Sequence, residues 1–286
     1  MTPGDRDDAL GGLPAKTPKF EYQGLSKCLD IIENQFSRDP TSPDFISDCL
    51  IFYNVHPHEF QNLAAQLKNT SAKFSSYDFR HYILTLKMAS PMHGEAASEF
   101  ANLVNSWRDS MQMRRDLPSG VSVKVRGGSK GKAPDASWVP RWHGADRNRY
   151  WPSMVVEVVF TETRTHLETD MRFWLKESKG DVKVAVSISV QPRKPGRVVL
   201  EQWSFTPSTQ ETRSKQGVLR VEQTMTAIRK PGQEPVISGS FALPFEDIFL
   251  KPTATEPNAK DLVITHSDMK DFAEVIWETQ FTPLSQ

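Results

Sequence analysis

The sequence predicts an α/β protein, a mixed β-sheet flanked by helices, and three neighbouring segments support that prediction. The run MVVEVVF (154–160) is apolar except for one acid, which is typical of a strand buried on both faces. An amphipathic helical segment (164–178) and a second apolar run, VKVAVSISV (182–190), follow it. A strand, a helix and a strand in this order favour a right-handed crossover, which makes the two strands parallel neighbours.

Composition indicates a folded chain without a strong overall charge. The 286 residues suffice for one large domain or two small ones, and 35 basic residues balance 35 acidic ones. A nucleic-acid site must therefore be a local patch of Lys and Arg. The first residues lack the apolar run of a signal peptide, and no stretch approaches the roughly 18 apolar residues of a membrane span. We expect an intracellular protein, in the nucleus or cytoplasm, with Cys28 and Cys49 as packed thiols.

Four segments of different texture follow one another along the chain. We predict a disordered tail at 1–20, a helical lead-in at 21–75, a core at 76–195 and a β-rich extension with a C-terminal helix at 196–286. Apolar spacing of three and four predicts three amphipathic helices in the lead-in. These are 25–36, a second piece carrying Phe45, Cys49 and Phe52, and 57–67.

The core and the extension contain several further elements. HYILTLKM (81–88) alternates enough to be a strand, and EAASEFANLVNSWRDSMQ (95–112) is a strong amphipathic helix. SVKVR (122–126) is a short strand before the turn GGSKGK. In the extension, RVVLEQWSF and GVLRVEQTMTAI are expected to pair, and PVISGSFALPF supplies a third strand. HSDMKDFAEVIWETQ forms a helix capped by Thr265 or Ser267.

Two acids are the candidate metal ligands. Glu157 stands in the middle of an apolar strand, where a carboxylate is costly unless it is paired or binds a cation. Asp135 precedes that strand, so neighbouring strands can hold both acids around Mg²⁺, which prefers oxygen ligands. Alternatively, Glu157 forms a salt bridge with Arg164 or Arg172, and Asp135 belongs to an ordinary Pro-Asp turn.

These motifs resemble the PD-(D/E)xK nuclease superfamily. The resemblance rests on PDASW, WPSMVVEVVF, the following helix and VKVAVSISV. More narrowly, the chain resembles the restriction-endonuclease-like proteins of fungal genomes, whose C-terminal region is similar to GSFALPFEDIFL and DLVITHSDM, so the likeness covers about 120–278. It implies a restriction-endonuclease-like core that hydrolyses phosphodiester bonds with Mg²⁺ or Mn²⁺. Asp135 and Glu157 match the first and second acids of the motif.

The third motif position departs from this pattern. The family has Lys two residues after the second acid, on the same face of the strand, and this chain has Val159. Candidate replacements lie on the following helix and strand: Arg172, Lys176 and Lys183. Each also fits an ordinary solvated cation. Glu95 and Glu99 on the earlier helix are further metal-ligand candidates, or simply exposed acids.

Basic and aromatic residues are interleaved between the hairpin and the strand with the acid. The basic ones are Lys124, Arg126, Lys130, Lys132, Arg141, Arg147 and Arg149. The aromatic ones are Trp138, Trp142, Tyr150 and Trp151. Basic side chains contact phosphates, and exposed aromatics stack on unpaired bases. Alternatively, the tryptophans anchor a solvated loop on the sheet.

Two functions therefore remain open at this point. The first is a Mg²⁺-dependent nuclease with a relocated cation. The second is a catalytically degenerate nuclease fold that binds nucleic acid or protein, and a scaffold that binds a protein partner is a weaker third. The sequence does not distinguish DNA from RNA and does not indicate an oligomeric state.

Overall fold

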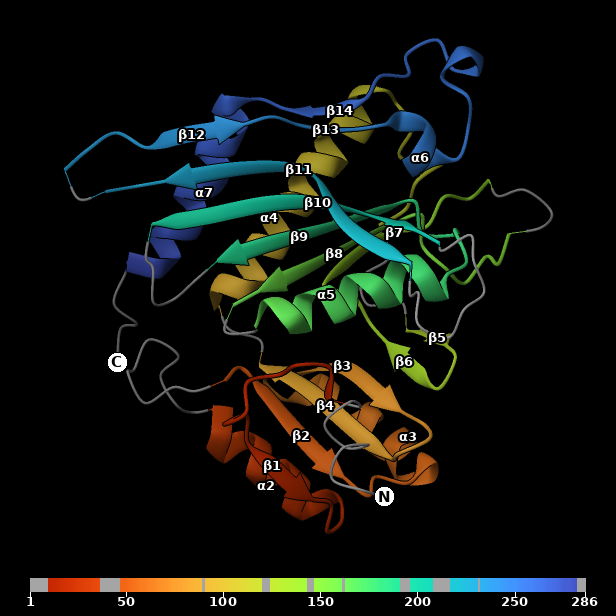
Figure 1. Cartoon of the computed structure of the whole chain (residues 1–286), viewed down its shortest axis with the longest axis vertical. Helices are drawn as coiled ribbons and strands as arrows, with labels where there is room; N and C mark the ends of the chain where they lie inside the picture. The colour runs from red at the N-terminus through yellow and green to blue at the C-terminus, as the bar shows by residue number, and fades with distance from the viewer. Residues whose placement is uncertain are drawn as a thin grey trace. The chain divides into compact units, whose positions relative to one another are not determined.

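The computed structural model describes residues 10–36, 47–88, 91–119, 124–142, 147–160, 163–190, 196–207, 217–230 and 232–281. The chain forms two compact units. Unit 1 comprises Met1–Pro91, Lys124–Ala133 and Phe160–Asp170, and unit 2 comprises Met92–Val123, Pro134–Val159 and Met171–Gln286. Each unit contains a six-stranded sheet with helices, which confirms the predicted α/β class (Figure 1).

The sheet of unit 1 has the order β1-β2-β4-β3-β6-β5. Its strands are β1 (Lys19–Glu21), β2 (Cys49–Tyr53), β3 (Ala72–Asp78), β4 (Ile83–Met88), β5 (Val125–Gly127) and β6 (Lys130–Lys132). β1 and β2 are parallel and the other pairs are antiparallel. The helices are α2 (Leu25–Phe36), α3 (Pro57–Gln66) and the 3₁₀ turn η1 (Leu67–Asn69).

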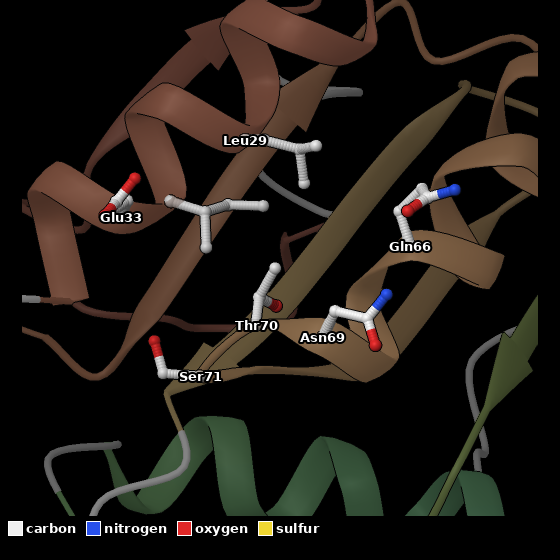
Figure 2. Close-up of a pocket in the computed structure, with 7 residues that line it drawn as sticks. Leu29, Glu33, Gln66, Asn69, Thr70 and Ser71 are labelled. Carbon is white, nitrogen blue, oxygen red and sulfur yellow. The ribbon is translucent and has the colours of Figure 1, made fainter.

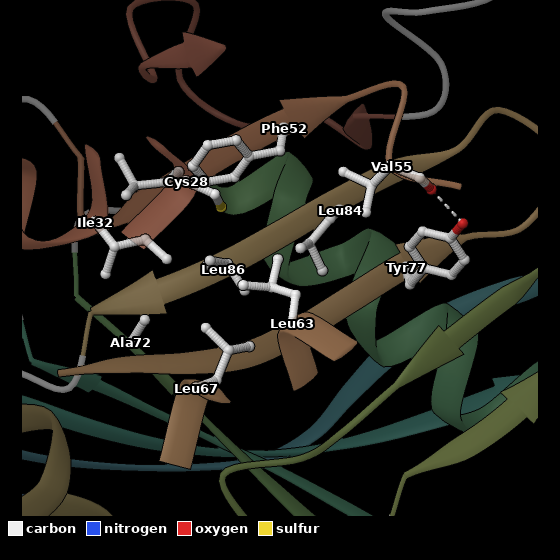
Figure 3. Packing of buried hydrophobic residues seen from close by; sticks show 11 residues of the cluster. Cys28, Ile32, Phe52, Val55, Leu63, Leu67, Ala72, Tyr77, Leu84 and Leu86 are labelled. Atoms are coloured by element: carbon white, nitrogen blue, oxygen red, sulfur yellow. Dashed lines mark hydrogen bonds between the residues drawn. The ribbon is translucent and has the colours of Figure 1, made fainter. Parts of the chain in front are cut away.

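Apolar side chains of α2 and α3 pack against strands of this sheet (Figure 3). Cys28 and Ile32 of α2 and Leu63 of α3 belong to one buried cluster with Phe52 and Leu84 from the strands. The helices predicted at 25–36 and 57–67 are thus confirmed within one residue.

The helix predicted to carry Cys49 and Phe52 is wrong, because both residues lie in β2, which pairs with β4. A short apolar run such as CLIFY fits a buried helix and a buried strand equally well by periodicity. Backbone pairing with β4, whose residues are all buried, decides for the strand. Phe45 lies outside the described residues.

The sheet of unit 2 has the order β12-β11-β10-β9-β8-β7. Its strands are β7 (Ala136–Trp138), β8 (Met154–Val159), β9 (Val184–Val190), β10 (Arg197–Thr206), β11 (Val218–Ile228) and β12 (Val236–Gly239). β8 and β9 are parallel, as predicted, and the other pairs are antiparallel. The strands β13 (Phe241–Leu243) and β14 (Leu262–Ile264) form a separate ladder beside α6 (Phe245–Phe249) and η3 (Thr253–Thr255).

Two long helices, α4 (Pro91–Ser110) and α7 (His266–Phe281), lie along one face of this sheet (Figure 1). Phe100 of α4 contacts Phe272 of α7, with ring centroids 6.4 Å apart. Thr265, and not Ser267, caps α7: its hydroxyl accepts from the Asp268 N–H, and the Asp268 carboxylate accepts from the Thr265 N–H.

The segment between β8 and β9 is α5 (Arg164–Arg172), which continues into a π-helical turn, Phe173–Glu177. A π-helical turn widens the helix and redirects the side chains that follow it, and such turns are frequent at functional sites. Within the described part of the chain, no helix is long and apolar enough to span a membrane.

Candidate active site

Glu157 is held inside the sheet of unit 2. All six residues of β8 are buried, and Glu157 is 4% exposed. Its Oε1 accepts a hydrogen bond of 2.7 Å from the indole N–H of Trp174, which is fully buried in the π-helical turn. A buried tryptophan needs an acceptor for its N–H, and here the carboxylate supplies it.

Asp135 is anchored to β8 on both sides of Glu157. Its backbone N–H donates to the Val156 carbonyl (3.0 Å), and its Oδ2 accepts from the Val158 N–H (2.7 Å). Because Val156 and Val158 flank Glu157 along the strand, Asp135 is fixed beside Glu157. The structure therefore brings the two sequence-predicted acids together.

His93 is a site residue that sequence reasoning missed. Its Nε2 lies 2.6 Å from Oδ1 of Asp135, and its side chain is fully buried in the first turn of α4. His93 precedes Ala96 by three residues and Phe100 by seven, so it belongs to the buried face of the helix. A titratable residue on a largely apolar helix face was the signal that could have identified it.

A polar row continues across the sheet from Glu157. Glu157 pairs in register with Ser187 of β9, and Ser187 pairs with Glu201 of β10, so the three side chains share one face. The Ser187 hydroxyl donates to Glu201 (3.4 Å) and accepts from the indole N–H of Trp203 (2.9 Å). Buried indole donors thus serve two members of the row, Glu157 and Ser187.

One family model matches a part of this chain that includes the site. Residues 59–182 match the model of the family Uma2, described as "Putative restriction endonuclease". The match covers less than half of the chain, and over this stretch the chain is similar to a putative restriction endonuclease. The matched stretch contains Asp135, Glu157 and His93.

One solved structure is also similar to this chain. It is the crystal structure of a putative nuclease belonging to DUF820 from Anabaena variabilis, with 14% identity, a TM-score of 0.37 and coverage of 70% of this chain and 90% of that one. No curated protein matches. The narrower resemblance to fungal proteins stays a prediction.

The candidate replacements for the PD-(D/E)xK lysine either contact other groups or are exposed. Arg172 donates to the Gly217 carbonyl (2.9 Å) and lies over the ring of Phe205. Lys176 and Lys183 are exposed, and among the described residues no ion pair joins either of them to the acids.

The other residues that were considered for the site from the sequence are at least partly buried or contact groups other than the two acids. Val159 is buried at the motif position. Arg164 pairs with Glu168 of the same helix. Glu95 and Glu99 are half-buried, and Glu99 accepts a hydrogen bond from Asn102.

Of the basic residues of unit 1 that were predicted to bind nucleic acid, some are exposed and others are partly or fully buried. Lys124 lies over the ring of Phe74 (4.9 Å) and Arg126 over that of Phe79 (4.1 Å), and both cations are exposed. Burial lowers the pKa of Lys130. Lys132 is buried and forms an ion pair with Asp170, so its position is that of a structural cation.

The basic and aromatic residues of unit 2 that were predicted to bind nucleic acid also divide into buried and exposed ones. Arg147 donates to the carbonyls of Trp151 and Asp181 and is half-buried, whereas Arg141 and Arg149 are exposed. Among the four aromatics, Trp138 and Trp151 are buried, while Trp142 and Tyr150 are exposed.

Unit 1 contains a pocket of about 390 Å³ between α2 and the segment that follows α3 (Figure 2). It is lined by Leu29, Ile32, Glu33, Gln66, Asn69, Thr70 and Ser71. Among these residues Glu33 is the one acid, and there is no basic side chain. The pocket offers hydrogen-bonding groups without an acid–base pair, and we assign it no catalytic role.

Proposed function

We propose that this protein is a nuclease that hydrolyses phosphodiester bonds in nucleic acid, with Mg²⁺ or Mn²⁺ held by Asp135 and Glu157. One observation carries the proposal: Glu157 is a carboxylate buried in the apolar strand β8, and hydrogen bonds to Val156 and Val158 anchor the carboxylate residue Asp135 to that strand. Two adjacent carboxylates repel each other when both are ionised, and a divalent cation removes that repulsion.

The donor chemistry of the pair fits a hard cation. Mg²⁺ is usually bound through one or two carboxylates and keeps several waters. Two carboxylates are therefore a sufficient contribution from the protein, and among the described residues no group of three or more His, Cys, Asp and Glu forms a larger ligand set. When bound, the metal would polarise the phosphoryl group and lower the pKa of an attacking water.

The neighbouring side chains have positioning roles in this proposal. An ionised carboxylate can only accept hydrogen bonds, so Nε2 of His93 carries the hydrogen that faces Asp135. Trp174 orients Glu157 in the same way through its indole N–H. Such supporting donors fix ligand geometry and raise metal affinity.

The test is calorimetric titration of Mg²⁺ and Mn²⁺ into the full-length protein and its Asp135→Ala/Glu157→Ala variant, followed by cleavage assays on DNA and RNA. We expect metal binding that the double variant loses. Asp135→Asn and Glu157→Gln should lower cleavage by more than about 100-fold, because losing even a supporting partner costs 10- to 100-fold. Glu99→Gln is the matched control. Wild-type cleavage by either Asn or Gln variant would refute the proposal.

The placement of the cations supports a second candidate, a nuclease fold that binds nucleic acid or protein without cutting. Val159 occupies the lysine position, and Arg172 is hydrogen-bonded elsewhere. Under this candidate the wild type binds its partner without binding Mg²⁺ or Mn²⁺, and Asp135→Asn leaves that binding unchanged.

A further inference from the structure

Hydrogen bonds fix the backbone of a turn in unit 2, residues 147–151, that carries the adjacent side chains of Arg149 and Tyr150. Nη2 of Arg147 donates to the carbonyls of Trp151 (2.8 Å) and Asp181 (2.9 Å). The Trp151 N–H donates to the Asn148 carbonyl (3.0 Å), and the Tyr150 N–H donates to Oδ1 of Asn148 (3.1 Å). Because these bonds order the backbone in advance, a ligand bound here would not have to order it.

The side chains on this turn are exposed, aromatic and cationic. Tyr150 is 63% exposed, and the guanidinium of Arg149 lies over its ring at 5.2 Å. Earlier in the chain, Trp142 is 53% exposed and follows Arg141, whose N–H donates to the Asp116 carbonyl (2.8 Å). Among the described residues neither Arg141 nor Arg149 forms an ion pair, so both charges are available to phosphates.

We propose that Trp142 and Tyr150, with Arg141 and Arg149, form a stacking site for unpaired bases, so that the substrate is single-stranded nucleic acid. This inference rests on the proposed nuclease function. An aromatic side chain can stack on any base that exposes a π-face, and unpaired bases expose one, whereas duplex bases are already stacked. The guanidinium groups of Arg141 and Arg149 can contact the phosphates that link those bases, which makes the site complementary in charge to a nucleic-acid strand.

Packing connects the stacking site to the acids within unit 2. Trp151, the last residue of the turn, is buried and makes an edge contact with Trp174 at 6.2 Å between ring centroids. Trp174 in turn donates to Glu157. Tyr150 precedes Glu157 by seven residues, so their Cα atoms are at most about 25 Å apart, within reach of a short oligonucleotide.

The test uses the full-length protein in EDTA, where binding can be measured without cleavage. Fluorescence anisotropy compares a labelled single-stranded DNA with a duplex of the same length. We expect the wild type to prefer the single strand, and Tyr150→Ala and Trp142→Ala each to weaken that binding by about 5- to 150-fold. Tyr150→Phe keeps the ring and should retain affinity within about twofold. Val263→Ala, another exposed apolar residue of unit 2, is the matched control.

The salt dependence provides a second readout. Arg149→Ala should lower the slope of log K against log salt by about 0.7, the value for one phosphate of a single strand. Unchanged binding in both alanine variants would overturn the stacking site, as would a wild type that prefers duplex or binds neither form. Failure of the nuclease proposal looks different: the wild type would bind single strands in EDTA but would not cut them with Mg²⁺ or Mn²⁺.

Discussion

The two units both bury carboxylates against a sheet, but they satisfy them with different partners. In unit 1, Asp170 forms an ion pair with Lys132, and both side chains are buried. In unit 2, the donors to Asp135 and Glu157 include the ring of His93, an indole and a backbone N–H. An ion pair with a lysine compensates the charge of a buried carboxylate, whereas hydrogen bonds from an indole or a backbone N–H fix its orientation. The two units therefore differ in that an imidazole and an indole orient the buried acids of unit 2, whereas an ion pair holds the buried acid of unit 1.

Removing the lysine from unit 1 should have the largest effect on stability. Lys132→Met leaves Asp170 buried without this partner, which costs about 3–5 kcal/mol of unfolding free energy. Lys132→Met/Asp170→Leu should recover most of that loss, because apolar pairs of similar volume suit a buried position. Urea unfolding measures both. A loss below about 1 kcal/mol in Lys132→Met would place the pair with weak surface salt bridges.

The same carboxylate should make unit 1 sensitive to acid. Burial alone raises the pKa of Asp170, but the charges of Lys132, His166 and Lys87 outweigh burial and hold that pKa below its ordinary value. Its stabilising contribution is therefore complete above the unfolded pKa, about 3.9, and is lost as pH falls through the lower folded value. Urea midpoints from about pH 5 to pH 2 should fall more steeply for wild type than for Asp170→Asn. Parallel curves would contradict the lowered pKa.

In unit 2, removing the histidine should affect metal affinity more than folding. His93→Ala takes away the donor to Asp135 and should weaken Mg²⁺ or Mn²⁺ binding by about 10- to 100-fold. His93→Gln keeps an N–H donor and should recover part of the loss. Calorimetry measures the affinity, and circular dichroism confirms the fold. Equal affinity in all three proteins would mean that the histidine is a packing residue.

The smallest expected effect is a gain in stability from Glu157→Gln. In metal-free buffer this change removes repulsion with Asp135, while the glutamine oxygen still accepts from Trp174. We expect the melting temperature to rise by about 1–3 °C, corresponding to less than about 1 kcal/mol. Added Mg²⁺ should then stabilise the wild type alone. An unchanged or lower melting temperature would count against a paired-acid site.

The sequence predicted helices with a long amphipathic pattern and strands with a strongly apolar run. β8 and β9 could be identified because both runs are rich in valine and flank an amphipathic helical segment, an order typical of a strand, a crossover helix and a strand. CLIFY could not be assigned, because five apolar residues fit two periods and the partner strand lies elsewhere in the chain. β3 was missed, since its exposed and buried residues do not alternate regularly.

The sequence predicted those site residues whose type is unusual for their surroundings in the chain. Glu157 was identifiable because a charge in an apolar strand requires an explanation. The burial of His93 was predictable from its place on a helix face, but its contact with Asp135 was not, because that contact joins residues separated by 42 positions and depends on side-chain directions. For the same reason the sequence could not separate Lys132, which is buried, from Arg149, which is exposed.

The discontinuous path of the chain through unit 1 has a consequence for biosynthesis. β3 pairs with β6, which arrives only after α4 has been made, and Asp170 follows later still. While the chain is being synthesised, one edge of β3 therefore stays unpaired until β6 is made, and an unpaired strand edge can pair with another chain and cause aggregation. A fragment that stops at Pro91 keeps that edge permanently, so the two units cannot be separated by cutting the gene once.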